Sequence, residues 1–266
     1  MLTNYHTHTT FCDGKNTPEE IVLYALDKGF KSIGFSGHGY TPFDLRYCMK
    51  NTDGYIKEVT ALKEKYKGKI QIYCGVEEDA FAPVDRQNFD YIIGSSHYFC
   101  VDGMYHPIDS AFDWFQKCLE LFQFDVLKMA EVYYSCFVDY ISERKPDIVG
   151  HFDLITKFDE MDEMRFLNNE AYIKIAEKYM CFAAQNDVIF EVNTGAIARG
   201  YRKAPYPAEN LLYILKKHDA KLVLASDSHN LNNLDFYFKE TKQMLKSIGF
   251  QHLYELDAGV FVKRSI

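Results

Sequence analysis

The stretch Asn4-Tyr5-His6-Thr7-His8-Thr9 gives the first indication of both the fold and a functional site. Side chains two residues apart on an extended strand point the same way, so His6 and His8 would present their imidazoles on one face. Paired imidazoles of this kind can hold a metal ion. One His-x-His pair also arises by chance on a solvated strand, so the interpretation depends on the rest of the chain.

The remainder of the chain alternates short β-rich runs with amphipathic helical stretches. The predicted strands are 2–8, 32–37, 70–76, 90–96, 147–151, 188–193 and 221–226, with a short last strand near 259–263. Thr17-Pro18-Glu19-Glu20 is typical of a helix start, and this helix is expected to run to about Lys28. Repeated strand-helix units imply a parallel sheet with right-handed crossovers, and about seven of them favour an α/β barrel over an open sheet.

Length and composition fit a single domain spanning residues 1–266. An α/β barrel commonly takes roughly 250 residues, and the 47% of apolar residues is enough for a packed core. No apolar run approaches the roughly 18 residues of a membrane span, and no secretory signal opens the chain. We therefore expect a cytoplasmic protein without a membrane partner.

Charge and cysteine content narrow the classes of partner. A formal net charge of −8 disfavours a broad nucleic-acid surface and favours a small-molecule substrate. The seven cysteines form no CxxC pair, and their odd number favours reduced thiols. Cys12 lies near the first histidines, and a packed thiol is favoured over a metal ligand there.

Polar side chains recur where the predicted strands end. They are His38, Glu77, His97, His151, Asp227 and His229. Side chains leaving neighbouring strands of a parallel barrel converge over its mouth, so these residues are expected to meet His6 and His8 in one metal cluster. Each alone would be an ordinary hydrogen-bonded residue. By contrast, we place His106 in a loop, His218 at a helix end and His252 before the last strand, and interpret all three as structural or solvated.

The order of these motifs resembles that of the PHP family (polymerase and histidinol phosphatase). The shared features are an early His-x-His, a Gly-His, a strand-ending Glu, a Ser-His, a second Gly-His and a late Asp-x-His, spread from His6 to His229. The resemblance implies a distorted seven-stranded, TIM-like βα barrel with two or three divalent ions. Zn, Fe and Mn all suit such mixed histidine and carboxylate sites.

The resemblance also implies a distribution of ligands among the ions. One metal would take His6, His8, Glu77 and Asp227; a second would share Glu77 with His97 and His151; a third would use Asp13, His38 and His229. Asp13 has an alternative role, because Cys12-Asp13-Gly14 also fits a turn with an Asx cap. Without Asp13, the third metal would bind more weakly.

Charge predicts what such a cluster binds. Three divalent ions would exceed the charge of the three carboxylates by about three, so the site attracts an anion. A phosphate monoester fits, with its oxygens on the ions and a metal-activated water as nucleophile. The departing oxygen needs a Lewis acid or a proton donor, and the third ion, Asp227 or His229 would serve.

Substrate contacts are expected from loops around the mouth. The segment 193–202 follows the sixth strand, where no metal ligand is expected, and Arg199 is the first choice for a phosphate contact because arginine holds phosphate bidentately. Arg202 and Lys157 are further phosphate candidates. For both arginines, the alternative is a solvated loop side chain.

Two stretches, Gly150 to Phe158 and Glu191 to Gly195, look like those of the family's histidinol-phosphate phosphatases. The resemblance implies hydrolysis of L-histidinol phosphate to L-histidinol and phosphate, in histidine biosynthesis, by attack of a hydroxide that bridges the metals. A cationic amino alcohol would also require a nearby carboxylate. Glu78, Asp79 and Asp153 are candidates, and spacing does not choose among them.

Alternatives remain open at this point. The chain would also fit a family phosphatase or phosphodiesterase acting on a nucleotide or another small phosphate ester, or, in another class, a non-catalytic metal-binding regulatory module. An amidohydrolase or deacetylase is less favoured, because the catalytic lysine pattern is missing. Segment 108–145 holds two helices' worth of sequence, and core-covering helices are favoured there over a lid or an oligomer contact. The oligomeric state is not indicated.

Overall fold

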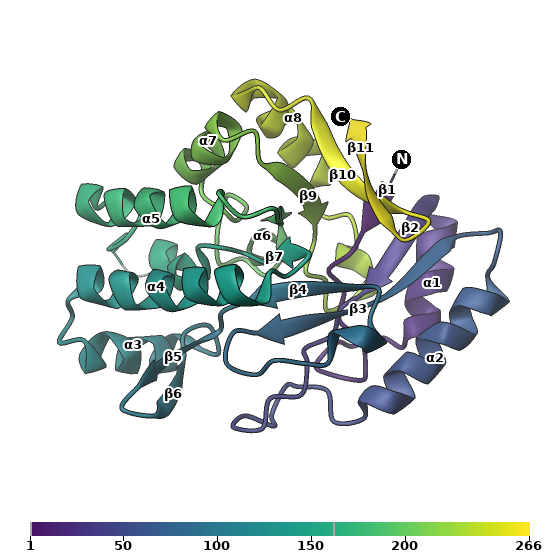
Figure 1. Cartoon of the computed structure of the whole chain (residues 1–266), viewed down its shortest axis with the longest axis horizontal. Helices are drawn as coiled ribbons and strands as arrows, with labels where there is room; N and C mark the ends of the chain where they lie inside the picture. The colour runs from purple at the N-terminus through teal and green to yellow at the C-terminus, as the bar shows by residue number, and fades with distance from the viewer. Residues whose placement is uncertain (1, 162) are drawn as a thin grey trace.

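In the computed structural model, which describes residues 2–161 and 163–266, seven parallel strands form one sheet (Figure 1). In spatial order they are β1 (Leu2–Asn4), β2 (Phe30–Phe35), β3 (Gln71–Asp79), β4 (Tyr91–Ser95), β7 (Ile148–Val149), β8 (Ile189–Asn193) and β9 (Lys221–Ala225). The spatial order follows the chain order, as in a barrel of successive right-handed strand-helix units and unlike an open doubly wound sheet. The sheet is a nearly closed barrel, which confirms the predicted fold class.

Helices cover the outside of this barrel, except for one short helix, α6 (Gly195–Ala198), which lies at its mouth beside Asp227 (Figure 1). They are α1 (Pro18–Asp27), α2 (Thr52–Lys65), α3 (Phe112–Leu121), α4 (Val126–Arg144), α5 (Glu170–Ala183), α6 (Gly195–Ala198), α7 (Glu209–Lys217) and α8 (Phe238–Ile248), with 3₁₀ turns at Arg86–Asn88, Leu154–Thr156, Asp159–Met161 and Leu231–Asn233. The predicted first helix is confirmed: Thr17 and Glu20 form a reciprocal capping box and Pro18 opens the helix. Within the described residues, no helix is both long and apolar enough to cross a lipid bilayer.

Two antiparallel hairpins add to the barrel. The first pairs β5 (Tyr98–Val101) with β6 (Met104–Pro107), and the second pairs β10 (His252–Asp257) with β11 (Val260–Ser265). The sequence analysis predicted only a short strand near 259–263. Asp102-Gly103 and Ala258-Gly259 both have positive φ at each residue, which is typical of a two-residue hairpin turn. The Asp-Gly pair was therefore an available signal for the first hairpin.

The first strand is shorter than predicted. Regular pairing ends at Asn4 instead of continuing to residue 8. Beyond it, Thr7 accepts a hydrogen bond from the Ser36 amide on one side and forms an isolated bridge with Ser228 on the other. The His-x-His stretch thus links the extensions of β2 and β9, and this link nearly closes the barrel.

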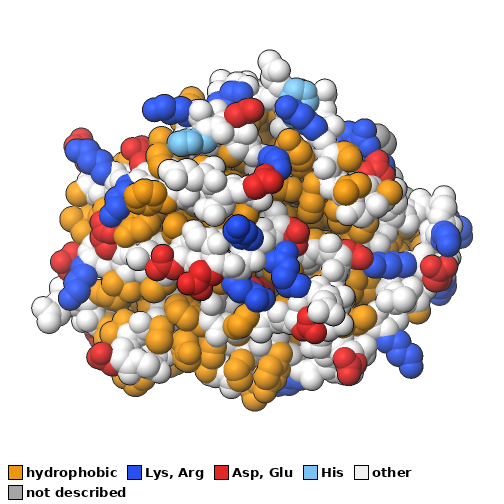
Figure 2. All heavy atoms as spheres, in the orientation of Figure 1, with side chains coloured by type: hydrophobic (Ala, Val, Ile, Leu, Met, Phe, Trp, Pro, Cys, Tyr) orange, Lys and Arg blue, Asp and Glu red, His pale blue; other side chains and the backbone are white. Residues whose placement is uncertain are grey.

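The predicted core-covering role of segment 108–145 is confirmed. Phe115 and Leu119 of α3, together with Met129 and Phe137 of α4, are buried in the largest hydrophobic cluster of the protein. On the face shown in Figure 2, hydrophobic side chains are interspersed with acidic and basic ones, and neither charge dominates there. The two helices contribute to the core of the same domain as the barrel.

The barrel interior is filled by tyrosines, and the C-terminal hairpin packs against them. Tyr5, Tyr73 and Tyr91 form one cluster with Leu256 of β10, whose backbone bonds the Tyr5 hydroxyl. A Cβ at Gly34 would lie 2.3 Å from the Tyr91 hydroxyl oxygen, so glycine leaves the room for this ring. A cavity lies at the end of the barrel where the strands finish, as in other parallel barrels.

Candidate metal centre

Backbone hydrogen bonds that nearly close the barrel join the early His-x-His motif to the late Asp-x-His motif. The His8 amide donates to the Ser228 carbonyl at 2.8 Å, and the Ser228 amide donates to the His6 carbonyl at 3.2 Å. These bonds set the His-x-His stretch beside Asp227 and His229. The His8 Nε2 atom then lies 3.1 Å from Asp227 Oδ1. Asp227 has a φ of 48°, an uncommon conformation for a non-glycine residue, of the kind often found at functional sites.

Glu77 lies at the centre of the cluster, in β3 and beside the residues that follow β2. Its Oε2 atom is 2.8 Å from His38 Nδ1, and its Oε1 atom is 3.0 Å from His151 Nε2. The Ser95 hydroxyl donates to Oε1 at 2.7 Å and fixes the carboxylate. His97 Nε2 is 3.4 Å from the same Oε1 atom. One carboxylate thus faces histidines from several strands, as a bridging ligand must.

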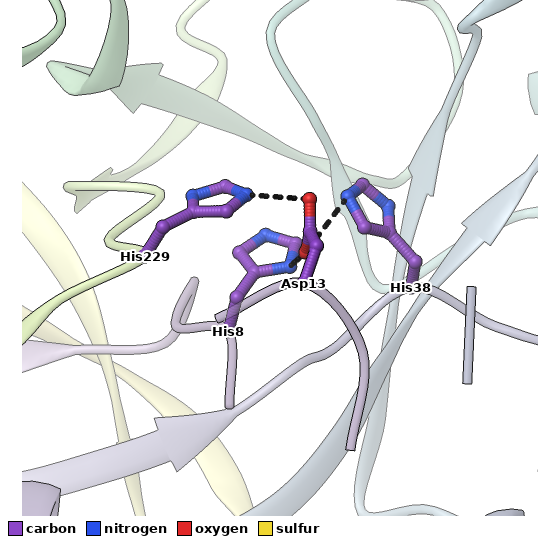
Figure 3. A group of neighbouring side chains, drawn as sticks. All are labelled: His8, Asp13, His38 and His229. Carbon is purple, nitrogen blue, oxygen red and sulfur yellow. Dashed lines mark ion pairs between the residues drawn. The ribbon is translucent and has the colours of Figure 1, made fainter. Parts of the chain in front are cut away.

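Asp13 reaches the cluster from the loop after β1, as Figure 3 shows. Its carboxylate lies between His38 and His229, with His229 Nε2 at 3.3 Å and His38 Nε2 at 3.8 Å, and His8 Nδ1 at 3.5 Å beneath. Gly14 permits this turn, because a Cβ there would lie 2.4 Å from the backbone of residues 8 and 9. The structure therefore places Asp13 where the metal interpretation requires it.

The structure brings all nine predicted ligands together. They fall into four overlapping groups whose ligand atoms lie within 4.8 Å of one another: His8, Asp13, His38 and His229; His6, Glu77 and His151; His6, His8 and Asp227; and His38, Glu77 and His97. The groups overlap differently from the implied ligand sets, because His8 faces Asp13 as well as Asp227. The three remaining histidines lie outside these groups: His106 is in β6, where a loop was predicted, His218 ends α7 and His252 begins β10.

Three atoms of this cluster test whether a cation fits. His6 Nε2, His8 Nε2 and Glu77 Oε2 are buried, and none makes a hydrogen bond of good geometry with the described residues, although His8 Nε2 lies near Asp227 and Glu77 Oε2 lies near His38. A buried polar atom left unpaired costs about 1–3 kcal/mol. A metal ion between them would satisfy two imidazole lone pairs and one carboxylate oxygen together. The donor set therefore fits divalent metal ions.

The carboxylates of the cluster are in the form that binds metal. Burial opposes ionisation of Glu77, but His6 and His38 hold its pKa well below the usual value. Burial also opposes ionisation of Asp227, and the nearby Arg199 guanidinium keeps the pKa of that carboxyl well below normal. Burial and the neighbouring His8 lower the pKa of His229, which favours its neutral, ligating form.

Two further carboxylates contact histidines of the cluster at Nδ1, the ring nitrogen that faces away from its centre. The sequence analysis did not predict these contacts. Glu191 of β8 accepts from His6 Nδ1 at 2.6 Å through Oε1, and its Oε2 atom accepts from the His151 amide and Asn193 Nδ2, each at 2.9 Å. Asp79 contacts His97 Nδ1 at 3.1 Å and its amide at 3.0 Å. Such contacts leave Nε2 of each ring directed at the cluster.

A cavity of about 360 Å³ opens above the cluster. Arg199 lines it from the end of α6, and its Nη2 atom donates to Asp227 Oδ2 at 2.8 Å while Nη1 donates to the Asp227 carbonyl at 2.9 Å. Lys157 also lines the cavity, and its Nζ atom donates to the Asp109 carbonyl at 2.6 Å. Both cations are therefore placed where an anion above the cluster would meet them.

Arg202 has a different environment from the one predicted. Its side chain is 1% exposed, and Nη1 donates to Thr156 Oγ1 at 2.9 Å and to Asp153 Oδ2 at 3.3 Å. It does not contribute to the lining of the cavity. Burying the guanidinium without a partner would cost far more free energy than burying it beside a carboxylate. Arg202 is therefore paired with Asp153. The predicted phosphate contact of Arg202 is not supported by this placement.

The three predicted ammonium-binding carboxylates are also engaged elsewhere. Asp153 pairs with Arg202, Asp79 contacts His97, and Glu78 accepts from Arg144 at 2.7 Å and from the Tyr140 hydroxyl at 2.7 Å. None of the three lines the cavity. Spacing could not reveal this, because each partner comes from a distant part of the chain.

The cavity is lined instead by residues that the sequence analysis did not single out. They include Asp44, Arg46, Tyr47, Tyr98 and Asp109. They come from the loop after β2, from β5 and from the turn before α3. Cys12, by contrast, donates to the Thr9 carbonyl with an S···O distance of 3.4 Å and belongs to none of the ligand groups found among the described residues.

Comparisons with known proteins agree with this geometry. The PHP domain family model matches residues 4–195. The curated relatives include a "Probable histidinol-phosphatase" of Schizosaccharomyces pombe, 27% identical over 97% of this chain and 90% of its own, and the "Histidinol-phosphatase" of Bacillus subtilis, 25% identical over 88% and 96%. A histidinol phosphate phosphatase of Lactococcus lactis, solved with zinc, L-histidinol and phosphate, is 21% identical, with a TM-score of 0.71 and coverage of 98% of each chain. This likeness extends over the whole barrel.

Proposed function

The chain belongs to the PHP domain family, and from this premise we propose that it hydrolyses L-histidinol phosphate to L-histidinol and phosphate with the help of bound divalent metals. The observation that carries the proposal is the cluster of nine ligands at the base of a cavity that Arg199 also lines. Curated relatives that cover nearly the whole chain are named for this activity.

The number of ions follows from the ligand groups. Glu77 belongs to two of the groups and would bridge two ions, and the group around Asp13 would hold a third. We propose two or three ions of Zn, Fe or Mn, because histidine and carboxylate ligands suit all three metals. When bound, such ions polarise a phosphoryl oxygen and lower the pKa of a coordinated water.

The residues of the chain would bind the phosphate and manage protons. Arg199 is held by Asp227, so its guanidinium is oriented before substrate arrives, and a planar fork matches two phosphate oxygens. Lys157 adds a second positive charge on the cavity wall. His229 Nε2 faces Asp13, at the more exposed side of the cluster. Asp227 or His229, both unprotonated before the reaction, would take the proton of the attacking water and pass it to the departing alcohol oxygen.

The cavity supports a small ester as the substrate. Its volume of about 360 Å³ falls near the low end of the usual range for small-ligand sites. Tyr47, Tyr98 and Tyr201 supply aromatic walls around the mouth. A substrate enclosed there would lose much of its contact with bulk water, which strengthens the electrostatic interactions at the base.

Phosphate release by purified protein reconstituted with Zn, Mn or Fe tests the proposal. The panel would contain L-histidinol phosphate, a nucleoside monophosphate and a sugar phosphate, and we expect the highest kcat/KM for L-histidinol phosphate. Equal turnover of the nucleotide would contradict this substrate and favour a broader phosphatase. Failure to release phosphate from any monoester after reconstitution would favour a non-catalytic metal-binding module.

A further inference from the structure

Four aspartates line the cavity, and two of them are outside the ligand cluster. Asp13 and Asp227 belong to the metal-ligand groups, whereas Asp44 and Asp109 do not. Asp44 is already neutralised: Oδ1 accepts from Arg46 Nε at 2.8 Å, and Oδ2 accepts from the Tyr98 hydroxyl at 3.0 Å and from the second arm of Arg46. Asp44 therefore has little capacity left for a ligand.

Asp109 is bound much less tightly. It lies in the turn between β6 and α3, and its side chain is 24% exposed. Lys157 Nζ makes its short contact, 2.6 Å, with the main-chain carbonyl of Asp109 and only a longer one, 3.3 Å, with Oδ2. The Oδ1 atom has no hydrogen-bond partner among the residues that the structure describes. A carboxylate can accept about four hydrogen bonds, so most of this capacity is open to the cavity.

The charge of Asp109 also suits a cation. Burial in the wall opposes its ionisation, but Lys157 and His97 lower its pKa below the usual value. Lys157 does not use up this charge, because its ammonium is held by the carbonyl and lies 5.0 Å from the centre of the Tyr201 ring and 5.5 Å from that of Phe158. A second cation could therefore bind to Asp109 while Lys157 stays in place.

The cavity is thus bipolar, with an anion-binding base formed by the metal ligands and Arg199 and an ionised carboxylate on its wall. We propose that Asp109 receives the ammonium group of the substrate and makes the site selective for phosphomonoesters whose alcohol carries a positive charge. The inference rests on the proposed function and deepens it. Asp109 is a specificity-determining residue, and it takes the place of the three carboxylates that the sequence had suggested.

The test is Asp109→Asn, which keeps the size of the side chain and leaves the carbonyl that anchors Lys157. Metal-loaded protein, freed of unbound metal, would be titrated with L-histidinol and with inorganic phosphate by calorimetry. We expect the Kd of L-histidinol to rise about ten- to hundredfold, as for loss of a charged hydrogen bond, and the Kd of phosphate to change less than about twofold. Asp113→Asn, an exposed position on α3, is the matched control and should change neither constant.

Kinetics give a second, independent readout. Wild-type enzyme should prefer L-histidinol phosphate over imidazolylpropyl phosphate, which lacks only the ammonium group, and Asp109→Asn should reduce the ratio of the two kcat/KM values about ten- to hundredfold. Unchanged L-histidinol binding in Asp109→Asn, or no L-histidinol binding by wild type, would overturn the inference. The proposed function would fail in a different way, through absence of phosphate release from L-histidinol phosphate, whatever the calorimetry showed.

Discussion

The contact between Glu191 and His6 gives a sharp prediction about metal affinity. For Nε2 of His6 to ligate a metal, the ring proton must be on Nδ1, and Glu191 Oε1 lies 2.6 Å from that atom. The other oxygen of Glu191 already accepts from two donors, the His151 amide and Asn193 Nδ2. Glu191 would therefore fix the tautomer of His6 as a ligand without itself binding the metal.

Glu191→Gln removes this constraint at nearly constant shape. If the new NH₂ group of the glutamine faced His151 and Asn193, the N–H donors of both residues would lose their acceptor and would face another donor. The other orientation keeps these bonds but presents an N–H group to His6 Nδ1, which moves the ring proton onto Nε2 and blocks ligation. We therefore expect metal affinity to fall about ten- to hundredfold, or about 1.4–2.7 kcal/mol.

Chelator competition with zinc measures this loss, and urea unfolding of the metal-free protein separates it from a fold defect. Glu131→Gln is a matched control, since Glu131 pairs with Lys178 and Tyr179 on the surface, away from the cluster. It should bind zinc like wild type. Wild-type zinc affinity in Glu191→Gln would refute the tautomer argument. The argument would also be refuted if the metal-free variant were unfolded and this alone accounted for its loss of zinc affinity.

Three further predictions concern the site and the barrel. Arg199→Ala should raise KM for L-histidinol phosphate about tenfold or more with metal content unchanged by elemental analysis, because a bidentate phosphate contact is lost; an unaltered KM would refute its role. Gly34→Ala should lower the free energy of unfolding by about 1–3 kcal/mol in urea titrations, because its Cβ would meet the Tyr91 hydroxyl. A Tyr91→Phe background should reduce that loss, and an equal loss in both backgrounds would contradict the packing argument. In the metal-free protein, burial lowers the pKa of His6, but Glu191 and Glu77 outweigh it and raise the pKa to about 10. Its contribution to stability is therefore complete below the unfolded value of about 6.5 and is lost as pH rises through about 10. Urea unfolding across this range should show the decline, and His6→Asn should flatten it.

The gathering of the nine predicted ligands in one place was predictable because it follows from topology. In a parallel barrel every strand ends at the same rim, so a residue such as His97 or His151 needs only its place after a strand to be assigned to the mouth. The distance along the chain does not matter: His151 and Glu77 are 74 residues apart and 3.0 Å from each other. Asp13 required the resemblance as well, because it lies in a loop whose turn depends on Gly14.

Partners of buried charges were not predictable in the same way. Arg202 and Asp153 were both assigned to the substrate, yet they bind each other from segments 49 residues apart. Nothing in either local sequence says whether a side chain leaves its loop toward the cavity or toward the core. Glu191 illustrates the opposite case, since an inward-facing acid in a strand was visible in the sequence, but its partner His6 lies 185 residues away.

The difference between residues placed by strand ends and residues placed by loops also separates the predicted metal cluster from the residues that should decide substrate selectivity. Most of the ligands come from the ends of barrel strands, whose positions the hydrogen-bonded sheet fixes. The wall of the cavity comes from the loop around Asp44, from β5 and from the turn at Asp109, segments that the sheet does not constrain. Changes in these segments can alter which alcohol is accepted while the metal cluster stays intact. The charge at Asp109 is consequently the feature of the wall that should decide between a cationic and a neutral phosphate ester.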